Sequence, residues 1–307
     1  MSSEAIDQLL HAIANISHVE RPYLENLLTI KKLEIAKEPV DKEHLEVLSK
    51  ITMWENELIS LNSWTLQWAV MKITCSLQAE KDRATEGLRK ANALALESEK
   101  KVQTEKDKIH DVEVTNEKYA VDYRSLQKYR EDISVLLDSA LTGSFQSIET
   151  LHEGIEETKK RSAEKFEKIR KLEKVKELLK KADFALLEAI LELRQSSVKE
   201  HLMGEGKVYF PQTAYDCLTQ AREEYPELPG FKSPTEYINE ADNTGAYYSP
   251  MQKYLWDVRR RLAELILWCD SEALVQLAEE TEVQIELGRK IDEYNFERRG
   301  IVKKGLN

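Results

Sequence analysis

A long proline-free stretch constrains the fold of this chain more than any other feature. No proline occurs between Val40 and Phe210, and up to residue 203 only three glycines interrupt the stretch, at positions 87, 143 and 154. Because proline breaks a helix interior and glycine weakens it, such a stretch permits very long helices. The charged fraction of 33% is also typical of long helices and coiled coils. The sequence therefore predicts an all-α protein.

One short break divides this stretch, at Thr142-Gly143-Ser144. Glycine can end a helix in the left-handed conformation, and Ser144 can cap the next one. The break leaves two arms of similar length, near 77–141 and 144–203, each spanning roughly 90 Å at the rise of an α-helix. Equal arms joined by a tight turn predict an antiparallel coiled-coil hairpin, a stalk formed by residues 77–203.

Residues 1–76 are expected to form the N-terminal helices of an elongated helical-bundle head. A helix starts afresh near Pro22, and another begins after a break at Pro39, capped by Asp41. Residues 204–250 form a connector rich in proline and aromatic residues, with a short helix near 234–241. Aromatic residues are scarce in disordered linkers, so this connector is expected to pack onto helices. Residues 251–307 supply a last long helix, from Met251 to about Arg299, that packs on the head.

The tryptophans indicate where the head core lies. All five occur in two windows near the two ends of the chain, and none lies in the 187 residues between them. Trp54, Leu61 and Trp68 recur every seven residues and therefore share one helical face. Packing the two windows together gives a head core of Trp54, Leu61, Trp64, Trp68, Trp256 and Trp268. A tryptophan-lined ligand pocket is the alternative.

A basic stretch at residues 159–181 stands out in a chain of net charge −11, because it holds eleven Lys and Arg against four Glu. One hypothesis is contact with an anionic membrane or phosphate surface; nucleic acid is disfavoured by the acidic chain. The residues expected to make this contact are Lys159, Lys160, Arg170, Lys171, Lys174 and Lys181. The favoured interpretation is a face that is solvated or paired within the chain. The last helix carries seven carboxylates and no cation between Leu262 and Gly288.

No pattern of a catalytic or ligand-binding site is present. The chain lacks a Gly-rich phosphate loop, a His-Glu-x-x-His motif and a nucleophile elbow, and its six histidines are scattered. Cys75, Cys217 and Cys269 lie far apart, which favours reduced thiols in a cytoplasmic protein. We therefore predict no catalytic, cofactor-binding or metal-ligating residue, no cofactor and no enzyme. No signal peptide is visible, and the most apolar segment, 58–79, contains polar residues that disfavour a membrane span.

These features predict a helical scaffold or assembly protein that acts through helix–helix contacts, with a protein partner or a second copy of itself. The alternative is a membrane-active protein peripheral to a membrane. Long antiparallel helices with a basic stretch are similar in outline to BAR-domain proteins, which bind curved membranes. A helical head with a projecting hairpin is similar in outline to the helical pore-forming toxins. The chain carries no sequence motif of either family.

Overall fold

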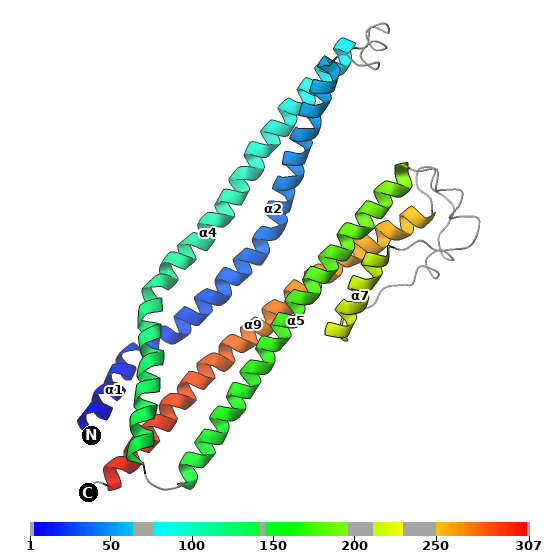
Figure 1. Cartoon of the computed structure of the whole chain (residues 1–307). Coiled ribbons are helices and arrows are strands. Elements are labelled where there is room, and N and C mark those ends of the chain that lie inside the picture. The colour runs from blue at the N-terminus through cyan, green and yellow to red at the C-terminus, as the bar shows by residue number, and fades with distance from the viewer. Residues whose placement is uncertain (1–2, 64–76, 142–144, 196–210, 230–249, 306–307) are drawn as a thin grey trace. The chain divides into compact units, whose positions relative to one another are not determined.

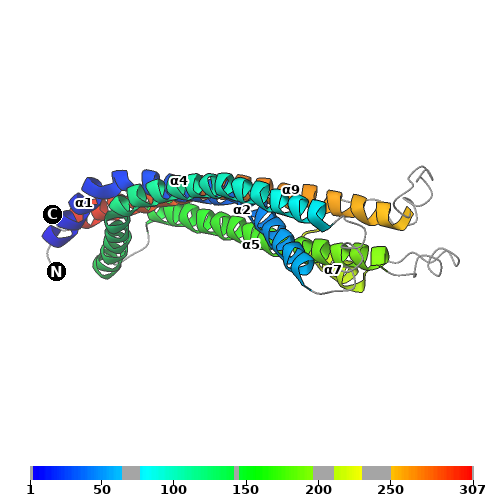
Figure 2. The ribbon, with the colours of Figure 1, turned by 90° about the horizontal axis from the view of Figure 1, so that it is seen from above.

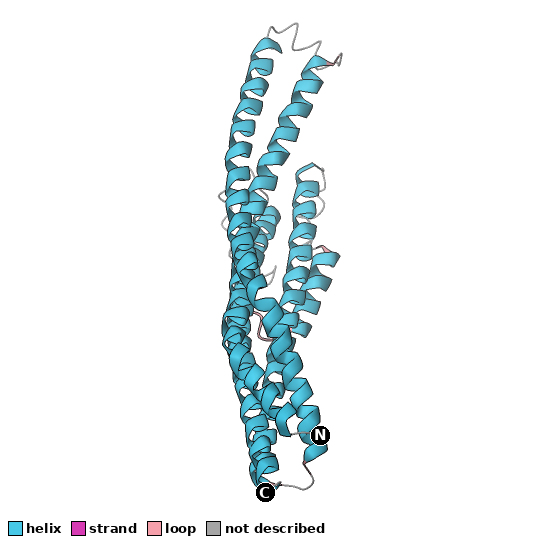
Figure 3. Ribbon diagram, turned by 90° about the vertical axis from the view of Figure 1, so that its left-hand side faces the viewer, coloured by secondary structure: helices cyan, strands magenta, loops and turns pink. Residues whose placement is uncertain are grey.

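The computed structural model of the chain describes residues 3–63, 77–141, 145–195, 211–229 and 250–305. Within these ranges nearly every residue is helical and none belongs to a strand, as Figure 3 shows. The predicted all-α class is confirmed.

The helices follow one another as α1 (Ser3–Ile16), the short 3-10 helix η1 (Ser17–Val19), α2 (Glu20–Asn62), α4 (Leu77–Ala140), α5 (Gln146–Gln195), α7 (Gln212–Glu224) and α9 (Pro250–Gly305). They form two compact units, Met1–Leu136 and Leu137–Asn307. The first unit contains α1, η1, α2 and most of α4. The second contains the end of α4 together with α5, α7 and α9.

In the first unit α2 and α4 run antiparallel and side by side (Figure 1). Near the start of α2, Arg130 of α4 donates two hydrogen bonds to the Glu20 carboxylate, at 2.6 and 2.8 Å. Further along, the Nδ1 of His44 lies 2.8 Å from the Ser98 hydroxyl. The hydroxyl donates its one proton to a backbone carbonyl, so the imidazole Nδ1–H donates to Ser98. Residues later in α2 contact residues earlier in α4, so the two helices pair in an antiparallel arrangement.

The contact between α2 and α4 follows a heptad pattern. Within the first unit the buried residues of α4 lie three, four, seven, ten or fourteen apart, all at the two core positions of a heptad: Ala84, Ala91, Ser98, Val102, Asn116, Leu126, Arg130 and Ile133. Such spacing is typical of a two-stranded coiled coil. Near the end of the pair a large residue meets a small one. A Cβ atom added to Gly87 would lie only 2.6 Å from the nearest carbon of the Trp54 indole ring.

The expected break at Pro39 is wrong. Helix α2 continues through this residue, and Asp41 pairs with Lys37 of the same helix at 2.5 Å instead of capping a new one. An interior proline removes one backbone hydrogen bond and costs about 3 kcal/mol, so packing against α4 must offset that cost. The expected restart near Pro22 agrees with the structure, because α2 begins at Glu20 after η1 and places the proline in its first turn.

In the second unit α5 and α9 form a second antiparallel pair, visible side by side in Figures 1 and 2, and α7 packs against α5. The C-terminal half of α5, the start of α9 and the inner face of α7 share a dense apolar core. α7 contributes Ala214, Leu218 and Ala221, at positions i, i+4 and i+7 of one helical face. Its last turn is followed by the buried residues Tyr225 and Leu228.

The two partners of α5 explain an unusual apolar pattern in its sequence, where apolar residues recur every third position and therefore wind around the helix. Phe166 begins the line on the solvent side and is 64% exposed. Leu172 and Val175 are buried in the core, and Leu178 lies on the side that α7 covers. A line that winds around the helix suits a helix with neighbours on two sides.

The predicted stalk is only partly reproduced. α4 and α5 span almost the expected arms and are separated at the expected break, where residues 142–144 lie outside the described ranges. The pairing of these arms with each other is not confirmed. The described contacts of α4 within the first unit are with α2, and those of α5 are with α9 and α7. Each arm has an apolar partner outside the proposed hairpin.

The described residues of the predicted head core are divided between the two units. Leu61 is buried in the first unit and Trp54 is half-buried there, whereas Trp268 packs against the core of the second unit. Trp256 is 43% exposed and is not a core residue; its ring faces the guanidinium of Arg259. Trp64 and Trp68, like the short helix expected near 234–241, lie outside the described residues.

Candidate interaction surface

The contact between α5 and α9 brings the basic stretch of α5 against the acidic stretch of α9. Arg161 donates to Glu286 at 2.5 Å, and Lys165 pairs with Glu279. Deeper in the seam the Lys176 ammonium lies 2.6 Å from the Asp270 carboxylate, and both side chains are nearly buried. The predicted pairing of the basic stretch with the acidic last helix is therefore confirmed for these residues.

The charge signs along this seam change in a fixed order. The three α5 cations just described face α9 carboxylates, but further along the sign is reversed, and Arg259 of α9 donates two hydrogen bonds to Asp183 of α5, at 2.7 and 3.0 Å. At the other end Lys290 of α9 donates to the hydroxyl of Thr158. A shift of the helices along each other would place like charges together, so this order specifies the antiparallel register.

Ion pairs in this unit lower the pKa values of two carboxylates. Lys290 and, next, Arg161 hydrogen-bond the Glu286 carboxylate and lower its pKa below the ordinary value. The pKa of Glu224, at the end of α7, is lowered by the ammonium of Lys174. In both cases the carboxylate form is favoured because a cation holds it. The surface is therefore built from ionised pairs at neutral pH.

The six residues predicted to contact an anionic surface lie on the side of α5 that faces away from the α9 seam. Three of them have acidic partners: Lys159 pairs with Glu156, Arg170 with Glu167, and Lys174 with Glu224. The other three are Lys160 and Lys181, which are exposed, and Lys171, which is half-buried. Acidic neighbours on the same helix and on α7 thus divide this face, and the structure brings the six cations into no common pocket.

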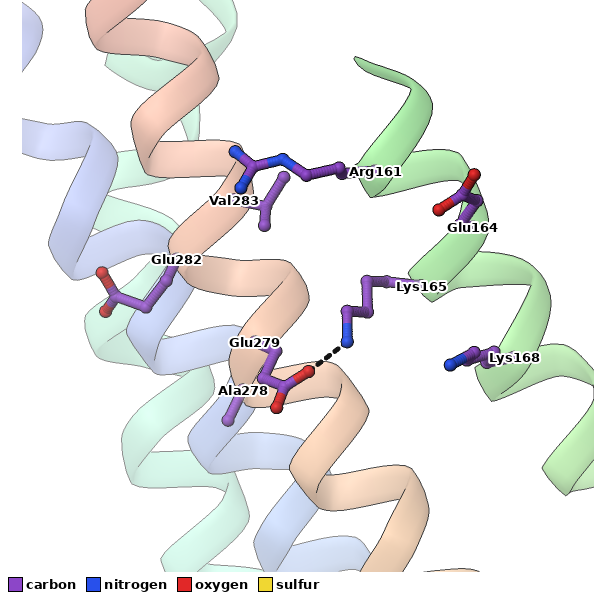
Figure 4. A pocket seen from close by; sticks show the side chains of 8 residues that line it. All are labelled: Arg161, Glu164, Lys165, Lys168, Ala278, Glu279, Glu282 and Val283. Carbon is purple, nitrogen blue, oxygen red and sulfur yellow. Dashed lines mark hydrogen bonds and ion pairs between the residues drawn. The ribbon is translucent and has the colours of Figure 1, made fainter. Parts of the chain in front are cut away.

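An open groove of about 680 Å³ lies between α5 and α9 (Figure 4). Lys165 reaches across it toward Glu279, and Arg161 extends from α5 toward α9 above this pair. The lining consists of Arg161, Glu164, Lys165, Lys168, Ala278, Glu279, Glu282 and Val283. None of these is a nucleophile activated by a base, because the amines are cationic and the acids are paired or exposed. The groove therefore presents charged side chains from both helices.

Metal and thiol chemistry have no support within the described ranges. No group of three or more His, Cys, Asp and Glu residues converges there in a way that could hold a metal ion. Burial, with a smaller effect from Asp270, raises the pKa of the Cys269 thiol to about 11. A thiol with this pKa is almost wholly protonated at neutral pH and is a poor nucleophile. No described helix has a stretch apolar enough to cross a bilayer.

Sequence reasoning missed the residues that the structure places at the α2–α4 pair. The heptad line of α4 is composed largely of alanine, serine and polar residues, so its hydrophobic periodicity is weak, but the three- and four-residue spacing could have revealed it. Between residues 45 and 96 the pair also leaves six large apolar side chains 40–66% exposed: Leu45, Leu48, Met53, Ile59, Leu94 and Leu96.

Comparison with known proteins identifies no relative. No protein-family model matches the chain, and no curated protein or solved structure shows significant similarity to it.

Proposed function

We propose that the protein is a non-enzymatic helical assembly protein that works through helix–helix contacts. The observation that carries this proposal is the number of large apolar side chains left exposed along the α2–α4 pair. Residues between the two helices are buried, yet six large apolar side chains between residues 45 and 96 remain exposed. Clusters of exposed large apolar residues on soluble helices mark contact sites for other proteins.

The ion pairs of the second unit support the same proposal. Four cations of the basic stretch, Arg161, Lys165, Lys174 and Lys176, pair with carboxylates of α9 and α7 and so help to hold that unit together. This leaves the exposed apolar residues of the first unit as the surface best suited to a partner.

Light scattering on the purified full-length chain tests the proposal. We expect an average mass that rises with concentration up to about 100 micromolar, or a complex with a protein partner at defined stoichiometry. A strictly monomeric chain for which no stoichiometric protein complex can be reconstituted would contradict the assembly function.

A membrane-active protein is the second candidate, and one observation favours it. The two ends of the apolar segment 58–79 belong to the antiparallel helices α2 and α4, and residues 64–76 between them lie outside the described ranges. Flotation with neutral and anionic liposomes separates the two functions. Salt-sensitive binding that is lost when Lys159, Lys160, Arg170, Lys171 and Lys174 are reversed in charge would favour a peripheral binder, and dye release would favour pore formation. An absence of binding to every vesicle would leave the assembly function.

A further inference from the structure

The inner seam of α2 is its line of buried and half-buried residues at Lys37, Val40, His44, Val47, Ile51, Trp54 and Leu58. A second heptad line runs along α2, one residue after each of these positions. We call it the acidic seam, and it consists of Glu38, Asp41, Leu45, Leu48, Thr52, Glu55 and Ile59. Six of the seven residues are exposed, including three large apolar ones, and the remaining one, Asp41, is half-buried. The acidic seam contains three carboxylates and no cation.

A matching line runs along α4, one residue before each position of its inner seam. We call it the basic seam, and it consists of Arg83, Lys90, Leu94, Glu97, Lys101, Thr104 and Lys108. All seven residues are exposed, and Leu94, near the middle, is 49% exposed. Four cations stand here against a single carboxylate, so the basic seam is opposite in charge to the acidic seam of α2.

The two seams lie on opposite faces of the α2–α4 pair. In an antiparallel coiled coil, residues that precede the inner seam on one helix share a face with those that precede it on the other. The salt bridge between Glu43 and Lys101, at 3.2 Å, joins two such residues. The acidic seam follows the inner seam and therefore lies on the other face. One copy of the chain cannot bring its own two seams together.

We propose that the acidic seam of one copy docks on the basic seam of a second copy. In the register of the existing pair, where His44 faces Ser98, this contact sets Leu48 beside Leu94 of the second copy. The same register sets Asp41 beside the second copy's Lys101, which is still about half exposed although it already pairs with Glu43. The leucines give the contact an apolar centre, and Asp41, which also pairs with Lys37 of its own helix, meets Lys101 of the second copy two turns away.

This contact is heterologous, because it joins two different surfaces. Each pair of copies leaves one acidic and one basic seam open, so association continues into chains or closes into rings. The inference rests on the proposed assembly function and specifies its surface.

Two single variants test the inference with light scattering and sedimentation velocity. Leu48→Arg disables the acidic seam and leaves the basic seam intact, and Leu94→Glu does the reverse. We expect each variant alone to be monomeric at concentrations at which the wild type associates, a loss of affinity of about tenfold or more. An equal mixture should form a one-to-one dimer and nothing larger, because it contains one functional pair of seams.

The mixture also controls for folding, since only folded variants can restore the dimer. Val121→Arg is the matched control; this α4 residue is 61% exposed but lies outside both seams, so its association should equal that of the wild type. Wild-type association that survives in both variants would refute the seams and leave the assembly function standing. A wild type that is monomeric throughout would refute self-association itself. Variants that remain monomeric when mixed would refute the heterologous arrangement.

Discussion

Replacing Gly87 by alanine sets two known effects against each other at one position. In an exposed helix interior this change stabilises the folded state by about 1 kcal/mol, because alanine has the higher helix propensity. Here the new Cβ would lie 2.6, 2.7 and 2.8 Å from three carbons of the Trp54 indole. Carbon atoms in contact are normally about 3.5–4.0 Å apart, so the ring must move.

The clash should be the larger effect. Overpacking of a well-packed contact costs typically about 1–3 kcal/mol, and a rigid indole has few ways to yield. We therefore expect Gly87→Ala to destabilise the α2–α4 pair by about 1 kcal/mol. In a Trp54→Leu background the ring is absent, and the same change should stabilise the pair by up to about 1 kcal/mol. The sign of the effect should thus reverse, with a coupling energy of about 2 kcal/mol.

Hydrogen exchange measured by mass spectrometry on α4 peptides gives the opening free energy of this region directly. Gly154→Ala on α5 is the matched control, since its Cβ would meet only the Lys290 ammonium, at 4.0 Å, and should stabilise its helix. If Gly87→Ala increases protection in the wild-type background, Trp54 does not pack on this glycine and the proposed register of α2 and α4 is wrong.

Three further predictions concern buried or paired groups. Arg130→Leu should destabilise the first unit by about 3–5 kcal/mol, because it leaves the buried Glu20 carboxylate without its bidentate partner. Urea unfolding measures this loss, and a cost below about 1 kcal/mol would show that the pair is solvated. The pKa of Glu286 is lowered in the folded state, so its contribution to stability is present above the unfolded pKa of about 4.3 and is lost as the pH falls through the folded value. The protection factors of amides in the paired region, which are corrected for the pH dependence of intrinsic exchange, should therefore fall as the pH is lowered, and Glu286→Gln should weaken this pH dependence. The Cys269 thiol, buried and with a raised pKa, should react with a thiol reagent at pH 8 only after unfolding, and rapid labelling of the native protein would contradict this placement.

The long helices could be derived from sequence because they depend on local chemistry. Without proline between residues 40 and 210, and with charged residues at most solvent positions, the backbone has few alternatives to helix. The exception shows the limit of that argument. Pro39 should end a helix by its own preferences, but α2 passes through it because the contact with α4 continues on both sides.

The charge pairing of α5 with α9 was also within reach of the sequence, because a block of cations and a block of carboxylates are both visible in it. The individual residues that pair could not be predicted from the sequence. Arg161, Lys165 and Lys176 face α9, whereas the six cations first singled out lie on the far side, and only the rotation of each helix about its axis decides between them. That rotation is set by the apolar core that α5 shares with α7 and α9.

The sequence by itself determined that this chain is helical, that two long helices are separated near residue 143, and that it holds opposite charges able to pair. The tertiary structure alone decided which helix pairs with which: α2 with α4, and α5 with α9 and α7. The physical reason is that helix formation depends on neighbours three or four residues away, whereas helix pairing depends on the fit of surfaces far apart in the chain. An indole seated over Gly87, or a guanidinium buried against Glu20, is such a fit, and it leaves no local pattern in the sequence.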